Sequence, residues 1–227
     1  MYTLLIGNKN YSSWSLRPWA AMRGLGIDFE EVLIPFGERP PGGSIAERSP
    51  SGKVPCLIDG DVAVWDSLAI LEYLAERHAG VWPVDAKARA YARSASAEMH
   101  SGFFALRGQC GMNCGLRVHL HAVTPALQAD LDRLVSLWRY GFDRFGGPWL
   151  AGDAFSAVDA MFAPVAFRAQ TYDLPLPADA DEYAVRLLSL PVLQAWYESA
   201  LQERWRDAAH EDEVQQSGVV TSDLRLR

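Results

Sequence analysis

Long apolar runs are missing from this 227-residue sequence: no stretch approaches the roughly 20 residues that a helix needs to cross a bilayer. The first residues turn polar directly after Gly7, too early for the core of a signal peptide, and no positive residue precedes them. We therefore expect a cytoplasmic protein that neither spans nor binds a membrane.

A surplus of positive charge is also missing. The sequence holds 21 Lys and Arg against 28 Asp and Glu, which gives a formal net charge of −7 at pH 7. Proteins that bind nucleic acids or anionic membranes favour a basic surface, so no nucleic-acid partner is expected. The composition suits a small neutral or thiol ligand better.

Cysteine is scarce, with Cys56, Cys110 and Cys114 the three in the chain. An odd number without an export signal indicates reduced thiols rather than disulfides. Cys110 and Cys114 are one helical turn apart and His119 and His121 follow, so a metal site has to be considered, but the spacing matches no standard zinc pattern. We expect small, buried, reduced thiols and no metal.

In the first part of the chain, short β-prone runs alternate with helical spacing, and Gly and Pro separate them. The predicted elements are a strand at Tyr2–Ile6, a helix through Leu16, Trp19, Ala20 and Met22, a strand at Phe29–Ile34, a Pro/Gly-rich loop at Pro35–Gly52, strands at Val54–Ile58 and Val62–Trp65, and a helix at Ser67–His78. If the loop contains a short helix, this βαβαββα order is the thioredoxin-like layout, with the first two strands parallel.

From Asp85 on, the strand signals vanish. Helical spacing with good helix formers recurs at Ala86–Arg107, Pro125–Phe145, Ser156–Tyr172 and Pro191–Trp205. The tail after Arg206 is polar and charged, and we expect it to pack loosely or to be disordered. The sequence thus predicts an α/β thioredoxin-like domain at residues 1–80, a linker at 81–85 and an all-α helical domain at 86–227.

Hydroxyl groups gather where the first predicted strand gives way to the first helix. A serine at that place is a favoured N-cap whatever the protein does. A serine hydroxyl and the positive helix terminus can also stabilise a bound thiolate together. Ser12 and Ser13 are therefore the candidate catalytic residues, and Tyr11 and Ser15 remain alternatives.

Pro55 stands at the mouth of an apparent interior strand, where a missing N–H is normally a defect. One interpretation is an edge strand. The other is a cis Val54-Pro55 bond that turns the N–H and C=O of Val54 outward, where they can pair with an extended, peptide-like ligand.

Asp66 and Ser67 lie at the junction between the fourth strand and the following helix. Either is an ordinary N-cap. The functional alternative is that the Ser67 hydroxyl and N–H hold a ligand carboxylate at the helix N-terminus while Asp66 meets an ammonium group. A zwitterionic amino-acid end would suit that pair.

These motifs, in this order and on these elements, resemble the soluble glutathione transferases over nearly the whole chain. The run SSWSLRPW at Ser12–Trp19 resembles the SSxS motif of zeta-class and related bacterial members, and VPCLIDGDVAVWDSLAILEYL at Val54–Leu74 looks like the glutathione-binding stretch. FSAVDAMFAP at Phe155–Pro164 is similar to the capping motif of the helical domain. There Ser156 would cap a helix, and the side chain of Asp159, three residues later, would accept a hydrogen bond from the Ser156 backbone. Such a capping box serves folding rather than chemistry.

The resemblance implies an enzyme that transfers the thiolate of glutathione, its co-substrate, to a small hydrophobic electrophile in detoxification. Ser12 would stabilise the sulfur, Val54 beside Pro55 would pair with the cysteinyl backbone, and Ser67 with Asp66 would hold the γ-glutamyl end. Lys53 would meet the glycyl carboxylate.

The electrophile would lie against the helical domain near Met99–Asn113, where Phe103, Phe104 and Met112 offer apolar surface. The resemblance also implies a homodimer.

Three alternatives stay open. A glutathione-dependent isomerase of the maleylacetoacetate type is permitted by the SSxS resemblance, although Trp14 stands where the zeta motif has cysteine. A thiol-disulfide oxidoreductase shares the fold but carries a cysteine at the start of the first helix, where this chain has serine. A non-catalytic binding protein would retain the transferase fold without turnover.

Overall fold

A computed structural model describes residues 1–226 of the chain. Its first part contains β1 (Tyr2–Ile6), α1 (Ser13–Gly24), β2 (Phe29–Leu33), α2 (Ile45–Arg48), β3 (Cys56–Asp59), β4 (Val62–Val64) and α3 (Ser67–Ala75). The strands form one sheet in the order β2-β1-β3-β4, with β1 and β2 parallel and the other pairs antiparallel. The predicted βαβαββα thioredoxin-like order is confirmed. β3 begins at Cys56 rather than Val54, and Pro55 before it has no N–H to donate to a ladder.

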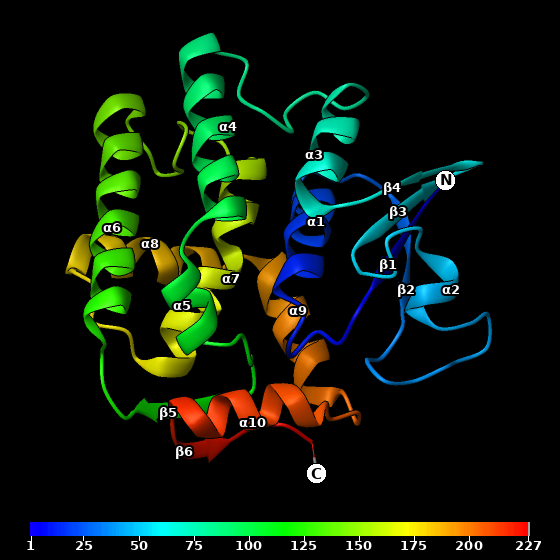
Figure 1. Cartoon of the computed structure of the whole chain (residues 1–227). Helices are drawn as coiled ribbons and strands as arrows, with labels where there is room; N and C mark the ends of the chain where they lie inside the picture. The colour runs from blue at the N-terminus through cyan, green and yellow to red at the C-terminus, as the bar shows by residue number, and fades with distance from the viewer. Residues whose placement is uncertain (227) are drawn as a thin grey trace.

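Figure 1 shows how these elements are layered. Helices α1 and α3 lie between the sheet and the helical half of the molecule, while the short α2 lies on the outer side of the sheet. The starts of α1 and α3 therefore face the helices that follow in the chain.

The second part is mainly helical, as predicted. It contains α4 (Ala86–Ser101), α5 (Phe104–Gln109), α6 (Pro125–Phe145), α7 (Ala157–Tyr172), α8 (Ala178–Leu188), α9 (Pro191–Gln202) and α10 (Ala208–Ser217). The single helix predicted at Ala86–Arg107 is wrong, because the chain is extended at Gly102 and left-handed at Phe103, which separates α4 from α5. Helices α8 and α10 were not predicted.

Two short strands contradict the expectation that strands end before Asp85. β5 (Leu116–Leu120) pairs antiparallel with β6 (Gly218–Asp223). The prediction of a loose or disordered tail is also wrong for the residues described, since α10 and β6 lie within it and run along the base of the molecule in Figure 1. The pairing joins segments about a hundred residues apart, so no local turn pattern indicates it.

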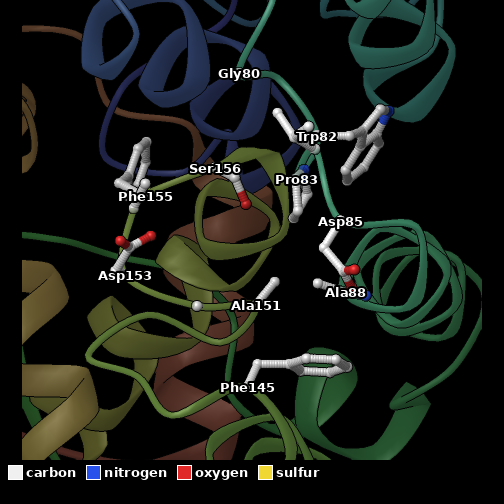
Figure 2. A pocket seen from close by; sticks show the side chains of 13 residues that line it. Gly80, Trp82, Pro83, Asp85, Ala88, Phe145, Ala151, Asp153, Phe155 and Ser156 are labelled. Atoms are coloured by element: carbon white, nitrogen blue, oxygen red, sulfur yellow. Dashed lines mark hydrogen bonds between the residues drawn. The ribbon is translucent and has the colours of Figure 1, made fainter.

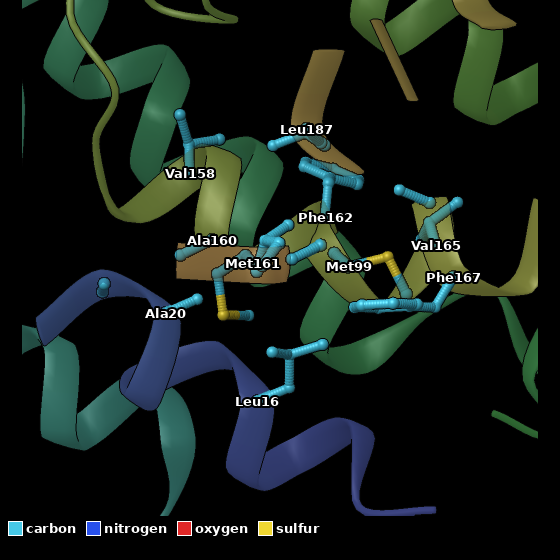
Figure 3. Close-up of a cluster of buried hydrophobic side chains, with 14 of the residues drawn as sticks. Leu16, Ala20, Met99, Val158, Ala160, Met161, Phe162, Val165, Phe167 and Leu187 are labelled. Atoms are coloured by element: carbon cyan, nitrogen blue, oxygen red, sulfur yellow. The ribbon is translucent and has the colours of Figure 1, made fainter. Parts of the chain in front are cut away.

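The largest hydrophobic cluster joins both halves of the chain, and α1 packs against α7 within it. Figure 3 shows Leu16 and Ala20 of α1 pointing toward Met161 of α7. Helix α7 begins with the predicted capping box: Ser156 is its N-cap and Asp159 accepts the Ser156 N–H at 3.0 Å. The helix that carries Ser12 at its start is thus fixed by the helical half.

The three cysteines are buried, as predicted, and none is bonded to another. Among residues 1–226, no group of three or more His, Cys, Asp or Glu side chains is placed to hold a metal ion. None of the helices described for the same residues has the combined length and apolar character that a membrane crossing needs.

Candidate functional site

Two adjoining cavities open between the thioredoxin-like half and the helical half. The larger, of about 790 Å³, is lined by the start of α1, by α5 and by residues of α7 and α10. The smaller, of about 520 Å³, lies by the start of α3. Both share Trp14, Lys53, Val54 and Arg107 as lining residues, so they form one continuous candidate site.

Ser12 and Ser13 both line the larger cavity at the start of α1. Ser12 is the N-cap: its Oγ accepts the Ser15 N–H at 3.3 Å and donates to the Ser15 Oγ at 2.7 Å. Ser15 Oγ in turn accepts the Gly7 N–H at 3.2 Å. Two hydroxyls in contact can reverse their hydrogen bond, and with Ser15 as donor the Ser12 proton is free to point into the cavity.

The Val54–Pro55 peptide bond is cis, as the functional interpretation of that motif predicted. The N–H and C=O of Val54 lie outside the β3 ladder, which begins at Cys56. Lys53 is exposed and lies at the rim shared by both cavities. This backbone can therefore offer hydrogen bonds to an extended ligand that bridges the two cavities.

Asp66 and Ser67 line the smaller cavity. Asp66 caps α3 by accepting the N–H groups of Leu68 at 3.0 Å and Ala69 at 3.3 Å, and its second oxygen meets His100. Burial alone would raise the pKa of Asp66, but the hydrogen bonds from His100 and the helix backbone outweigh it and lower that pKa. Ser67 is fully buried, and its Oγ has no hydrogen-bond partner among residues 1–226. A buried hydroxyl without a partner is costly unless a ligand supplies one.

Three arginines surround Trp14 and the serines. The guanidinium of Arg17 lies 4.1 Å from the centre of the Trp14 ring, and that of Arg107 lies 5.3 Å from it. Arg168, 3% exposed, donates to Ser13 Oγ at 3.4 Å. Burial lowers the pKa of Arg168 to about 10 and lowers that of Arg17 as well. Both side chains still remain cationic at neutral pH, since Arg does not deprotonate in proteins.

The C-terminal segment closes one side of the larger cavity, where His210 of α10 is a lining residue. The His210 ring stacks on Tyr11 at 5.0 Å and on Phe36 at 5.3 Å between centroids. Tyr11 donates its hydroxyl to Glu211 at 2.6 Å, and Glu211 also pairs with Arg225. Burial, reinforced by this bond to Glu211, raises the pKa of Tyr11. Its hydroxyl is therefore committed to Glu211, which disfavours Tyr11 as the donor to a sulfur.

The electrophile region predicted near Met99–Asn113 is brought to the larger cavity only in part. Phe104 and Met112 line it. Phe103 and Met99 are buried in the hydrophobic cluster instead, because the break between α4 and α5 turns Phe104 outward and Phe103 inward.

A separate cavity of about 600 Å³ lies beside the predicted linker (Figure 2). Two of its polar side chains serve the fold, since Asp85 caps α4 and Ser156 belongs to the capping box of α7, and the third acidic or hydroxyl residue, Asp153, is exposed. The remaining wall includes Phe145 and Phe155. This cavity is therefore a weaker candidate for a functional site than the two adjoining cavities at the starts of α1 and α3.

His100, Arg107, Arg168 and His210 were missed as site residues in the sequence. Arg168 carried a usable signal, since it is the one Lys or Arg in the otherwise mainly apolar run Ala157–Tyr172. The others sit on exposed or mixed faces, where a charged residue is ordinary. Only the packing of α4, α5 and α10 against the first domain brings them to the cavities.

Fold and site together define a thioredoxin-like domain with a helical domain packed on it and a cleft between them. The family models for the glutathione S-transferase N-terminal and C-terminal domains match residues 11–77 and 117–199. The chain therefore belongs to the glutathione S-transferase family.

Known proteins agree with this placement. Glutathione S-transferase F14 of Arabidopsis thaliana is 28% identical over 183 residues, which cover 76% of this chain and 69% of that protein. A probable maleylacetoacetate isomerase of Caenorhabditis elegans is 36% identical over 93 residues, 40% of this chain and 42% of its own length. A solved glutathione transferase homologue from Burkholderia, with bound glutathione, has a TM-score of 0.66 and 25% identity, covering 88% of this chain and 97% of its own.

Proposed function

We propose that this chain is a glutathione transferase that binds glutathione across the two cavities and transfers its thiolate to a small electrophile. The observation that carries the proposal is the convergence of Ser12, Val54 and Ser67 on one continuous site. Membership of the family supports glutathione as the co-substrate, and so does the glutathione bound in the Burkholderia neighbour.

Each part of glutathione meets a suitable group. The γ-glutamyl carboxylate bonds to the unpartnered Ser67 hydroxyl at the N-terminus of α3. Its ammonium group faces Asp66, whose lowered pKa keeps it ionised at neutral pH. The cysteinyl backbone pairs with Val54, and the glycyl carboxylate reaches the exposed Lys53. The sulfur then lies near the start of α1.

Ser12 acts as a hydrogen-bond donor to the thiolate and not as a base, since a neutral serine takes up no proton usefully. A free cysteine thiol has a pKa of about 8.5, and lowering it by about two units takes about 2.7 kcal/mol of preferential interaction with the thiolate. The Ser12 hydroxyl and the helix N-terminus supply much of this. A bond from Ser15 to Ser12 would strengthen the Ser12 donor, because linked hydrogen bonds polarise one another.

The test compares Ser12→Ala and Ser13→Ala with the wild type and with Ser189→Ala, an exposed serine far from the cavities. Glutathione binding is measured by calorimetry, and turnover with 1-chloro-2,4-dinitrobenzene. Ser12→Ala should keep its glutathione affinity within about threefold and lose about tenfold or more in turnover, because the hydroxyl supplies only part of the two pKa units and the helix N-terminus remains. Full turnover in Ser12→Ala with loss in Ser13→Ala would move the sulfur contact to Ser13. No glutathione binding at millimolar concentration would refute the function itself.

A second candidate function is a glutathione-dependent isomerase, which the match to the Caenorhabditis elegans isomerase favours. Assaying a maleyl substrate beside the chlorinated one separates the two.

The proposal also includes a cytoplasmic homodimer with a role in detoxification, and the domain limits 1–80, 81–85 and 86–227. Sedimentation equilibrium tests the dimer, and limited proteolysis tests the limits.

A further inference from the structure

The wall of the larger cavity is positively charged although the protein as a whole is acidic. Lys53, Arg107 and Arg168 line it against a single carboxylate, that of Glu213. The whole chain has a formal charge of −7. A local reversal of sign in a cavity concentrates anions there.

Arg168 is the centre of this charge. Its guanidinium donates to the carbonyl oxygens of Cys110 at 2.7 Å and Pro164 at 3.4 Å, and to the Ser13 hydroxyl. All of these are neutral acceptors, and within residues 1–226 no carboxylate forms an ion pair with Arg168. Two of its five N–H donors have no acceptor in the described part of the chain. Burying an unpaired charge is costly, so a buried, unpaired arginine at a cavity wall indicates an anionic ligand.

The neighbouring charges increase the need for an anion. Arg17 is fully buried, and none of its three guanidinium nitrogens has a hydrogen-bond partner in the described part of the chain. Arg107 and Arg168 both act on Arg17 as like charges. Asp66 and Asp130 offset part of this repulsion, since they act as opposite charges on Arg17 and on Arg107, but within residues 1–226 neither forms an ion pair with an arginine.

The two carboxylates of glutathione do not account for Arg168. In the proposed function the γ-glutamyl end occupies the smaller cavity and the glycyl end reaches Lys53. Arg168 lines the larger cavity only. The glutathione thiolate beside Ser12 and Ser13 supplies one negative charge in this cavity, and the second reactant is the remaining group that can meet the unused donors of Arg168 and Arg107.

We propose that the electrophile of this enzyme is an anion, an apolar body that carries a carboxylate, and that Arg168 and Arg107 bind this carboxylate. The inference rests on the proposed function and names its substrate class. The planar guanidinium of an arginine matches the two oxygens of a carboxylate. The apolar body packs on Phe104 and Met112, and the electrophilic carbon faces the sulfur beside Ser12 and Ser13.

The test uses two electrophiles that differ at one group, which is charged in one and neutral in the other: 4-chloro-3,5-dinitrobenzoate and its methyl ester. In both, the thiolate sulfur forms a bond to the carbon that bears chlorine, and chloride leaves with the electron pair of the broken bond. The thiol proton passes to solvent. Each rate is divided by the uncatalysed rate with glutathione, so that intrinsic reactivity cancels.

The wild type should prefer the carboxylate over the ester by about tenfold or more in kcat/KM. Arg168→Gln should reduce this preference to less than about threefold, with Arg168→Lys in between. Should Arg168→Gln fail to fold, Arg107→Gln, which replaces a half-buried side chain, provides a second test and should also reduce the preference for the carboxylate. Arg139→Gln, which removes an exposed arginine paired with Asp179, is the matched control and should keep the wild-type preference.

Efficient conjugation of both compounds with no preference overturns the inference and leaves the transferase function standing. Conjugation of neither, together with no glutathione binding, refutes the function. In that case, calorimetry with unreactive 3,5-dinitrobenzoate still decides the anion site: binding that Arg168→Gln abolishes supports it, and no binding overturns it.

Discussion

Replacing Glu203 with alanine should loosen the loop that leads to Ser12. Glu203 follows α9 and is 5% exposed. Its two carboxylate oxygens accept the backbone N–H of Lys9 at 2.7 Å and of Asn10 at 3.3 Å. The Asn10 side chain adds a bond to the carbonyl of Ala200. These contacts hold the β1–α1 loop against the helical half of the chain.

The magnitude follows from the groups left behind. Alanine leaves two buried N–H donors without acceptors, at about 1–3 kcal/mol each. Burial raises the pKa of Glu203, which means that burying its charged carboxylate costs free energy in the folded state. Glu203→Ala removes this cost, and the saving offsets part of the loss. We expect a net loss of about 3 kcal/mol in the free energy of unfolding. For a chain of this size that corresponds to a fall in Tm of roughly 6–12 °C.

Scanning calorimetry and urea unfolding measure the loss, with Glu198→Ala as the control. Glu198 is an exposed residue of α9 itself, so its replacement should change the free energy of unfolding by less than about 0.5 kcal/mol. Turnover should also fall in Glu203→Ala, because the loop no longer fixes the start of α1. Equal stability of the two variants would show that the reasoning about this loop is wrong.

Two further predictions concern pH and the C-terminal segment. Burial raises the pKa of Asp159 from 3.8 to about 6. Between these two pH values the folded state keeps a proton that the unfolded state has lost. The free energy of unfolding should therefore fall by about 3 kcal/mol as pH rises from about 4 to 6. Urea titrations at several pH values should show Asp159→Asn without this dependence, and identical profiles would contradict it. Glu211→Gln removes the ion pair to Arg225 but leaves the Arg225 pair with Asp223, so we expect faster amide exchange in α10 and β6 and a higher KM for the electrophile. Unchanged exchange there, with α4 as internal reference, would exclude a role for Glu211 in closing the cavity.

The extent of the sequence prediction differs between the two halves of the site. Ser12, Val54-Pro55 and Asp66-Ser67 stand at strand ends and helix starts, where caps, turns and short apolar runs act over a few residues, so their placement beside one another followed from the βαβαββα order. Ser12 and Asp66 are indeed the N-caps of α1 and α3. Their roles toward glutathione stay predictions.

The cationic half of the site could not be predicted in the same way. Arg107 belongs to α5, a helix that exists because the chain breaks at Gly102 within a stretch of continuous helical spacing. Arg168 reaches Ser13 across 155 positions of sequence. No local pattern determines which distant arginine will lie beside a given serine.

The sequence by itself determined the order of the elements in the thioredoxin-like half and the helix starts that carry the serines, because hydrophobic period, capping and turn residues act locally. The family was indicated by the resemblance of its motifs. The tertiary structure alone decided what closes the cleft and what charge it presents. The pairing of β5 with β6, the stacking of His210 on Tyr11, and the approach of Arg107 to Trp14 and of Arg168 to Ser13 all join segments far apart in the chain. Such contacts depend on the packing of α1 against α7, which places the two halves against each other.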